Sequence, residues 1–253
     1  MGLFDKKFCS ICGQKVGTIF HRKLEDGFLC KDCAGKLSPF FSERRSSTAE
    51  EIREQLAYRE ENRKALESFH ITRTLGKGLK IHLDEDQRKF VITGEKNVLE
   101  ANPDLLDLAQ VTAVDVDVSE SQTEAQHKDA AGKMIGYVPP RYTFKASVQV
   151  IVRVNHPYFD TVTIPLDSSI TLNPGNPLPA SLKPMPKNNR EFMENFNMAN
   201  EIRRILLGAR QQSRNDAAAA NKPRTAVCCP NCGATTIPDL SGCCEYCGGP
   251  VGQ

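Results

Sequence analysis

The sequence has 253 residues, of which 40% are hydrophobic and 25% charged, and its formal net charge is +2. These proportions are ordinary for a globular protein, and the small net charge gives no support to a strongly basic nucleic-acid-binding chain. No run of about 18 apolar residues occurs, so we expect no transmembrane segment. Residues 1–9 lack the apolar core of a secretory signal, and we therefore expect a cytoplasmic protein.

The ten cysteines are the most informative residues of the chain. In a chain without an export signal, cysteines favour metal binding over disulfides. They also fall in two tight clusters, one toward each end, rather than being scattered. A disulfide framework is therefore the less favoured alternative.

The C-terminal cluster contains two Cys-x-x-Cys pairs. Its four candidate ligands are Cys229, Cys232, Cys244 and Cys247. A gap of two residues lets one tight turn direct both sulfurs at a single tetrahedral ion. Gly233 and Gly248 follow the second cysteine of each pair, where such a turn favours a positive φ. The pattern predicts a zinc ribbon over residues 228–253.

Two further cysteines, Cys228 and Cys243, each precede a candidate ligand. The Cys-Pro-x-Cys-Gly pattern begins at Cys229, which places the ligands there and at Cys244. We therefore expect Cys228 and Cys243 to be free thiols outside the metal site.

The N-terminal cluster offers a second set of four ligands, Cys9, Cys12, Cys30 and Cys33. Asp26-Gly27 between apolar residues predicts a hairpin turn. A short helix beginning at residue 34 would stabilise a thiolate at its N-terminus. A knuckle, a hairpin and a helix in this order predict a treble-clef-like zinc finger over residues 1–47. His21 is an alternative ligand, but the four cysteines suffice, and an exposed hairpin residue is the favoured interpretation.

Four cysteines complete the tetrahedral coordination of zinc, so each cluster is predicted to be a structural site for one Zn²⁺. A catalytic zinc would keep one position open for water. The sequence contains no phosphate-binding loop, no Gly-x-Ser-x-Gly elbow, no His-Glu-x-x-His motif and no dinucleotide fingerprint. We therefore predict no catalytic residue, no organic cofactor site and no enzymatic activity.

Residues 48–69 read as a charged connecting helix. Thr48 and Glu51 form a capping box at its start, and the apolar stripe that follows is thin. A solvated linker is the favoured interpretation, with a partner-binding helix as the alternative.

Residues 70–187 change to the alternating pattern of strands. About six or seven antiparallel strands are expected, packed as a small barrel or sandwich. Residues 120–141 read as a mobile polar loop. Asp115 and Asp117 lie two residues apart on a strand, which favours a solvated face over a paired-carboxylate site.

A final amphipathic helix is predicted from Asn188 or Asn189 to Gln212. Its apolar residues recur every three or four positions; they are Phe192, Phe196, Ala199, Ile202, Leu206 and Ala209. Four arginines make the end of this helix basic; they are Arg203, Arg204, Arg210 and Arg214. Because no aromatic stacking residues are interleaved with them, a solvated face is favoured over a nucleic-acid contact.

Together these patterns predict a multi-domain α+β protein. Its segments are the zinc finger (1–47), the connecting helix (48–69), a central antiparallel β domain with its closing helix (70–212), a linker (213–227) and the zinc ribbon (228–253).

The stretches from Phe8 to Gly13 and from Leu24 to Cys33 resemble the N-terminal zinc-finger domain of an uncharacterised, mainly Gram-positive bacterial family, a domain of unknown function. Val154 to Asp160 looks like the middle region of the same family. The resemblance implies zinc binding by the four N-terminal cysteines and a bacterial cytoplasm. The middle is similar in architecture to a pleckstrin-homology-like fold, and the tail resembles the zinc ribbons of many bacterial adaptors.

The favoured functional hypothesis is a non-enzymatic zinc-binding adaptor or scaffold that presents rigid surfaces to protein partners. One alternative is nucleic-acid binding through the ribbon, which Lys222 and Arg224 flank. Another is lipid or membrane-surface binding through the pleckstrin-homology-like middle, which rests on architecture alone.

Overall fold

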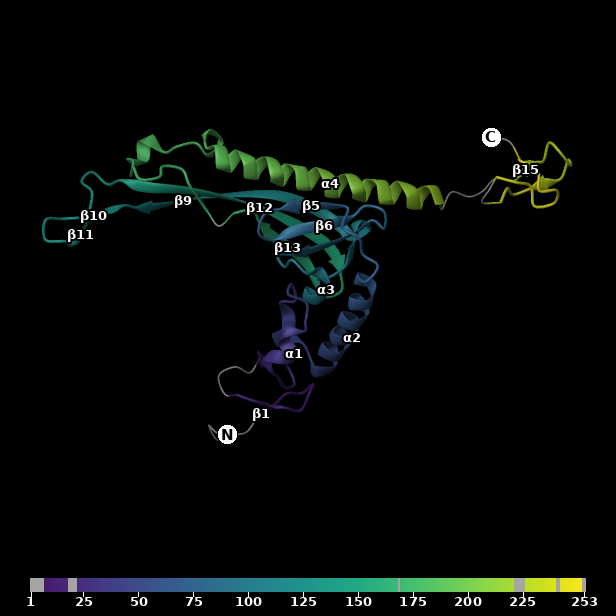
Figure 1. Cartoon of the computed structure of the whole chain (residues 1–253), viewed down its shortest axis with the longest axis horizontal. Helices are drawn as coiled ribbons and strands as arrows, with labels where there is room; N and C mark the ends of the chain where they lie inside the picture. Colours follow the sequence, from purple (N-terminus) through teal and green to yellow (C-terminus); the bar gives the residue numbers. More distant parts are fainter. Residues whose placement is uncertain (1–6, 18–21, 168, 221–225, 240–241, 252–253) are drawn as a thin grey trace. The chain divides into compact units, whose positions relative to one another are not determined.

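The computed structural model describes residues 7–17, 22–167, 169–220, 226–239 and 242–251. The chain forms two compact units, the first ending at Gln211 and the second beginning at Gln212. Figure 1 shows the elements of both units coloured along the sequence. The mixture of helices and antiparallel sheets agrees with the predicted α+β class.

The first unit begins with a small module of two hairpins and a helix. The hairpins pair β1 (Lys7–Phe8) with β2 (Lys15–Val16) and β3 (Arg22–Lys23) with β4 (Phe28–Leu29), and the helix is α1 (Lys31–Gly35). The second hairpin turns at Asp26-Gly27, as the sequence predicts. Leu24 and Leu29 are fully buried in a small core with Ile52, which belongs to the next helix. A short 3-10 helix, η1 (Glu43–Ser46), follows.

Helix α2 (Ala49–Leu66) begins with the predicted capping box between Thr48 and Glu51. The interpretation of this helix as a solvated linker is wrong, because one face of it is buried. Half of the residues on that face are polar; its members are Ala49, Ile52, Gln55, Arg59, Asn62 and Leu66. The spacing of three and four residues is helical, but a search for apolar periodicity misses a face built from Gln, Arg and Asn.

The central part contains two four-stranded antiparallel sheets. The first has the order β5 (Arg73–Gly76), β6 (Lys80–Asp84), β7 (Lys89–Thr93) and β8 (Leu106–Asp107). Helix α3 (Val98–Ala101) precedes β8, and the 3-10 helix η2 (Leu108–Gln110) follows it. In the second sheet β12 (Tyr142–His156) pairs with β9 (Val111–Glu124), β13 (Phe159–Pro165) and β14 (Ile170–Thr171). Among the described strands no ladder joins the sheets into a closed barrel, so the barrel form of the prediction is not found.

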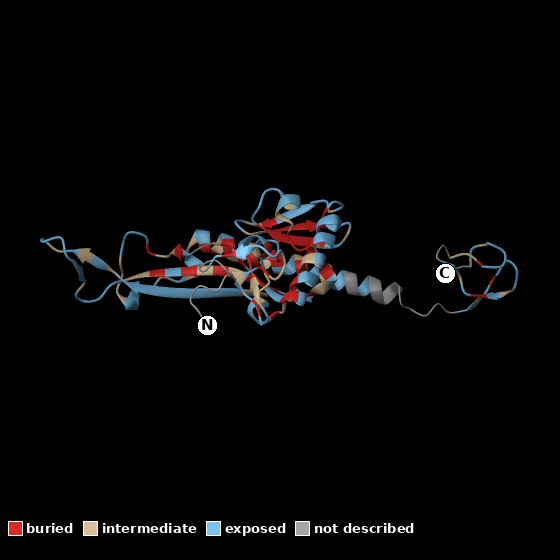
Figure 2. Cartoon of the chain, turned by 90° about the horizontal axis from the view of Figure 1, so that it is seen from below, coloured by how far each residue is buried: buried red, intermediate tan, exposed pale blue. Residues whose placement is uncertain are grey.

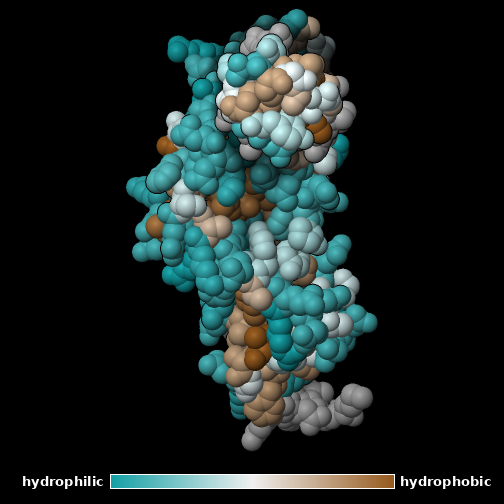
Figure 3. Space-filling view, turned by 90° about the vertical axis from the view of Figure 1, so that its right-hand side faces the viewer, coloured by the Kyte–Doolittle hydropathy of each residue, from teal (hydrophilic) through white to brown (hydrophobic). Residues whose placement is uncertain are grey.

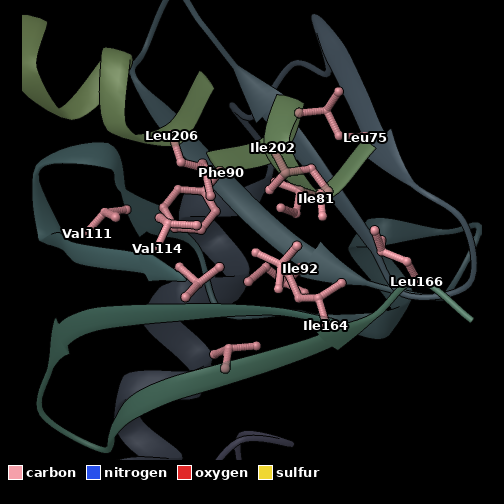
Figure 4. Close-up of a cluster of buried hydrophobic side chains, with 14 of the residues drawn as sticks. Leu75, Ile81, Phe90, Ile92, Val111, Val114, Ile164, Leu166, Ile202 and Leu206 are labelled. Carbon is pink, nitrogen blue, oxygen red and sulfur yellow. The ribbon is translucent and has the colours of Figure 1, made fainter. Parts of the chain in front are cut away.

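Both sheets and the last helix contribute to one apolar core. Figure 4 shows side chains of the first sheet, such as Phe90 and Ile92, facing Ile164 of β13 and Leu206 of the last helix. From Phe144 to Val154, β12 alternates between buried and more exposed positions, because successive side chains of a strand point to opposite faces. Burial of this apolar surface is the main source of the stability of the central part.

The predicted mobile loop at residues 120–141 contains the outer end of β9 and a further hairpin, which corrects that interpretation. β9 and β12 stay paired from Val111↔Val154 out to Glu124↔Tyr142. Beyond them β10 (Gln126–Lys128) pairs with β11 (Met134–Gly136). The outer residues of β9 are exposed on both faces (Figure 2), so backbone pairing holds this arm without an apolar signature in its sequence.

The last helix, α4 (Arg190–Ala220), lies alongside β9 and β12 in Figure 1. The 3-10 helices η3 (Ala180–Leu182) and η4 (Pro186–Asn188) lead into it. All six residues of the predicted apolar face are buried or partly buried in the core, as expected. The helix continues to Ala220 rather than ending near Gln212, because residues 216–220 are Asp and four alanines and alanine is the strongest helix former. The predicted linker therefore begins as helix.

In the described residues of the second unit, β15 (Val227–Cys228) pairs with β16 (Thr235–Thr236) in a short hairpin. Within the described ranges, no helix is long and apolar enough to cross a membrane. Hydrophilic residues cover most of the face drawn in Figure 3.

A buried ion pair connects the N-terminal module, α2 and the central part. Arg59 Nη1 lies 2.9 Å from Asp104 Oδ1, with 6% and 0% of the two side chains exposed. Arg59 Nε donates to the Lys36 carbonyl at 3.2 Å, and its Nη2 donates to the Asn102 carbonyl. Ser38 Oγ donates to the other oxygen of Asp104 at 2.7 Å. Asp104 therefore receives donors from the module and from α2 at once.

An aromatic cluster lies beside this pair. Nε2 of His156 and the hydroxyl of Tyr58 are 3.0 Å apart, and Nδ1 of His156 accepts from the Tyr158 backbone N–H at 3.4 Å. Because Nδ1 accepts, the neutral imidazole carries its proton on Nε2 and donates it to Tyr58. The Tyr58 hydroxyl in turn donates to Asp104 at 3.4 Å. Phe40 of the module packs on Phe159, with ring centroids 5.3 Å apart.

We expect removal of one partner of the buried pair to destabilise the first unit more than removal of one partner of an exposed pair. Asp104→Asn or Arg59→Met should lower the free energy of unfolding by about 3–5 kcal/mol, since the remaining charge stays buried. The double variant should lose less than the sum of the two. Urea denaturation followed by far-UV circular dichroism measures this, because the chain has no tryptophan.

The matched control for this cycle is the exposed pair Arg53–Glu50, at 2.7 Å with 50% and 71% of the side chains exposed. Glu50→Gln should change the stability by less than about 1 kcal/mol. Equal effects of Glu50→Gln and Asp104→Asn would contradict the importance given to the buried pair.

The stability of the first unit should also fall as the pH drops toward 5. Burial lowers the pKa of His156 below its ordinary value, and Arg59 lowers it further against the opposing effect of Asp104. A histidine with a lowered pKa stabilises the fold above its ordinary pKa of about 6.5, and that stability is lost as the pH falls through this range.

Urea denaturation of the wild type and of His156→Gln at about pH 7.5 and 5.5 tests the expectation. The wild type should lose more stability between the two pH values than the variant does. Burial also lowers the pKa of His82. Because His82 is present in both proteins, its contribution to the pH dependence cancels in the comparison. Identical losses would show that His156 does not titrate differently on folding.

Candidate metal centres

The structure brings the eight predicted ligands together in two groups of four, Cys9, Cys12, Cys30 and Cys33, and Cys229, Cys232, Cys244 and Cys247. Within each group the sulfur atoms lie within 4.8 Å of one another. Individual separations are 3.7 Å for Cys12–Cys30, 3.6 Å for Cys229–Cys247 and 3.7 Å for Cys232–Cys244. A tetrahedron with metal–sulfur bonds of about 2.3 Å has edges of about 3.8 Å. Each group could therefore hold a metal ion.

The first N-terminal pair is held by a tight backbone turn. The N–H of Cys9 donates to the Gln14 carbonyl at 2.8 Å, and the N–H of Gly13 donates to the Cys9 carbonyl at 2.9 Å. Gly13 has a φ of 70°, which only glycine adopts without strain. The turn directs both sulfurs to the same side.

The two C-terminal pairs repeat this turn. The N–H of Gly233 donates to the Cys229 carbonyl at 2.8 Å, and the N–H of Gly248 donates to the Cys244 carbonyl at 2.8 Å. The φ angles of Gly233 and Gly248 are 73° and 69°. The positive φ predicted for these glycines from the position after each pair is confirmed.

The second N-terminal pair is held differently, by the start of a helix. Cys30 is the N-cap of α1, and its sulfur accepts from the Cys33 backbone N–H at 3.3 Å. Cys33 lies within α1, which begins at Lys31, three residues earlier than expected. The exposed N–H groups of the first helical turn favour a thiolate at this position.

Without a cation, the crowded thiols cannot all ionise. Burial raises the pKa of Cys9, but backbone N–H groups of Cys12, Cys30 and Ile11 outweigh it and lower the pKa to about 6. Burial and the three neighbouring thiols raise the pKa of Cys33 well above its ordinary value. A divalent cation between the sulfurs removes this conflict, because it stabilises four thiolates at once.

The C-terminal group shows the same division. Burial raises the pKa of Cys244, but backbone N–H groups lower it to about 6. The Ala234 N–H lowers the pKa of Cys232, whereas the Cys247 thiol and burial outweigh it and raise the pKa to about 12. In each group the pKa values of some thiols are lowered and those of others are raised, so all four ionise together only with a cation bound.

Cys228 and Cys243 lie outside the four-sulfur group, in agreement with the predicted register. Cys228 is exposed, and its thiol donates to the Gly233 carbonyl at 3.4 Å. Cys243 is partly buried, and its backbone N–H donates to Asp239 Oδ1 at 2.9 Å. All ten cysteines lie in the described ranges, and none of them is in a disulfide there.

The other sequence candidates do not join a metal group within the described residues. His21 lies outside those residues. Asp115 forms an ion pair with Arg153 at 2.9 Å, and Asp117 accepts from Gln149 at 2.8 Å. Both carboxylates lie on the more exposed face of β9, as expected. The sequence analysis did not predict the buried polar group around Asp104. The sequence feature that indicates this group is the helical spacing of the polar residues on the buried face of α2.

Comparison with protein-family models matches residues 7–55 to the family described as Domain of unknown function (DUF4428). The matched segment contains the N-terminal four-cysteine group and the beginning of α2. This agrees with the resemblance to an uncharacterised family with a four-cysteine site. No curated protein and no solved structure matched the chain significantly.

The ligand register is tested by metal content. We expect two zinc ions per chain in the wild type made under reducing conditions with zinc supplied. Cys244→Ser should lose one of them, because three sulfurs and a hydroxyl bind zinc far more weakly than four thiolates. Mass spectrometry of the metal against protein concentration gives the ratio.

Cys243→Ser is the matched control, since it removes the neighbouring sulfur outside the group, and it should keep both ions. The opposite pattern, with metal lost from Cys243→Ser and kept by Cys244→Ser, would show that the register is wrong.

Proposed function

We propose that this protein is a non-enzymatic adaptor or scaffold that two structural zinc ions hold in shape and that binds other proteins. The observation that carries the proposal is that each cysteine group supplies four sulfurs. Four sulfurs complete the coordination of zinc and leave no position for a substrate or water. The ions would therefore act on structure rather than on a reaction.

The need for metal follows from the size of the two cysteine modules. The N-terminal module buries a core of few residues, and the C-terminal unit contributes one short hairpin. Segments of about 40 residues rarely bury enough apolar surface to fold alone. Binding of zinc to four thiolates supplies folding free energy directly.

We also propose the finer architecture. The order of knuckle, hairpin and helix in residues 7–35 supports a treble-clef-like finger. Two glycine-terminated turns in the second unit support a zinc ribbon. Two packed antiparallel sheets with a closing helix support a pleckstrin-homology-like middle. A division into finger, connecting helix, central β domain, linker and ribbon is part of the same proposal, with the closing helix extended to Ala220. A bacterial, cytoplasmic origin is another part of it, since thiols persist in a reducing compartment.

The test is affinity capture with the full-length zinc-loaded chain as bait, from a lysate of the cells that naturally produce it. We expect a reproducible set of proteins on the wild type and on Cys243→Ser, and a reduced set on Cys244→Ser, whose second metal site is incomplete.

Nuclease treatment of the lysate distinguishes the adaptor from the main alternative, which is nucleic-acid binding. Partners that persist after nuclease support the adaptor, whereas partners that are lost with nucleic acid would replace it with the nucleic-acid hypothesis. Recovery of no protein above the level of uncoated beads would contradict the proposal.

A further inference from the structure

A hollow of about 590 Å³ lies between the N-terminal module and the central sheets, both within the first unit. Its walls are partly apolar: Leu37 and Phe40 come from the module, and Leu79 and Ile92 come from the first sheet. Volumes of about 300–1,000 Å³ with apolar walls and a few polar groups are typical of small-molecule sites.

A second depression shares two arginines with the first. Arg22 and Arg44 line both, and Lys23 and Arg45 line the second. The backbone N–H of Glu25 donates to the Ser47 carbonyl at 2.9 Å and so fixes the β3–β4 hairpin beside η1. Basic side chains from two separate segments are thereby held beside the two depressions, with Arg22 and Arg44 shared between them.

One of these arginines has an unsatisfied buried atom. Nη1 of Arg44 is buried and has no hydrogen-bond partner among the described residues. Burial lowers the pKa of Arg44, and the charges of Arg22 and Arg45 lower it further. A buried donor of a charged group costs free energy unless it is paired. Glu95 lines the first depression and Glu25 the second, but among the described residues neither carboxylate pairs with Nη1 of Arg44.

Arg59 lines the same hollow and provides the contrast. Its Nε and both Nη atoms donate to protein oxygens, and Asp104 balances its charge. Among the described residues, the unsatisfied guanidinium atom at this interface belongs to Arg44, and Arg59 shows that a second arginine in the same hollow is fully hydrogen-bonded.

We propose that this hollow binds a small organic phosphate, with the phosphate held by Arg22 and Arg44 and the organic part packed against Phe40 and Leu79. Guanidinium groups bind phosphate through paired hydrogen bonds, and several positive charges match a dianion better than a carboxylate. The apolar wall next to the arginines matches an aromatic or aliphatic ester rather than the free ion.

Isothermal titration calorimetry of the full-length zinc-loaded chain in phosphate-free buffer tests this site. The probes are phenyl phosphate, inorganic phosphate and the uncharged benzyl alcohol. Phenyl phosphate should bind more tightly than inorganic phosphate, and benzyl alcohol should not bind. Equal affinity for the two phosphates, or no heat with phenyl phosphate up to about 10 mM, would overturn the proposal.

Arg44→Gln should weaken phenyl phosphate binding about tenfold or more, because a charged hydrogen bond is lost. Arg63→Gln, an exposed arginine on α2 outside the hollow, should leave it unchanged. Circular dichroism and zinc content show whether a variant is folded. If Arg44→Gln fails to fold, the exposed Arg22→Gln serves in its place. Unchanged binding in the folded variant would overturn the site.

A third arm separates a soluble ligand from a lipid headgroup. Vesicles containing phosphatidic acid present the same phosphate ester on a surface. Sedimentation of the wild type with these vesicles, without binding of soluble phenyl phosphate, would replace the proposal with a membrane contact. Binding of phenyl phosphate in solution that Arg44→Gln weakens would establish it.

Discussion

The buried ion pair between Arg59 and Asp104 is the contact on which the arrangement of the first unit depends. Asp104 is fully buried and receives Ser38 from the N-terminal module and Arg59 from α2, while Arg59 also binds the Lys36 carbonyl. Buried charges persist only when they are paired and hydrogen-bonded. The module, the helix and the central part must therefore be in place together for this group to be satisfied.

The buried ion pair and the four-sulfur groups both stabilise cysteine modules that are too small to fold well on their own. The N-terminal module has few buried apolar residues of its own. A metal ion would fix its two turns, and Asp104 and the contact of Phe40 with Phe159 attach it to a much larger core. The hollow lined by Arg44 lies between the N-terminal module and the central part. Its shape therefore depends both on the metal site of the module and on the contacts that attach the module to the core.

The sequence predicted best where chemistry requires one residue type at one position. The eight grouped cysteines, the glycines with positive φ and the Thr48–Glu51 capping box are examples. It predicted poorly where polar residues form structure. The buried face of α2 uses Gln55, Arg59 and Asn62 beside apolar residues, and the outer half of β9 is exposed, so neither segment shows a full apolar pattern. The end of α4 was missed because four alanines read as a linker although they favour helix. That the eight cysteines bind zinc stays a prediction.

The central claim is that each end of the chain is shaped by an ion bound to sulfur alone. X-ray absorption spectroscopy at the zinc edge of the full-length, zinc-loaded protein tests this claim most directly, because it reports the atoms bound to the metal. The account predicts four sulfur neighbours at about 2.3 Å for the average site and no nitrogen or oxygen ligand. A spectrum that required nitrogen or oxygen ligands at about 2.0 Å would contradict it, since one coordination position would then not be filled by cysteine.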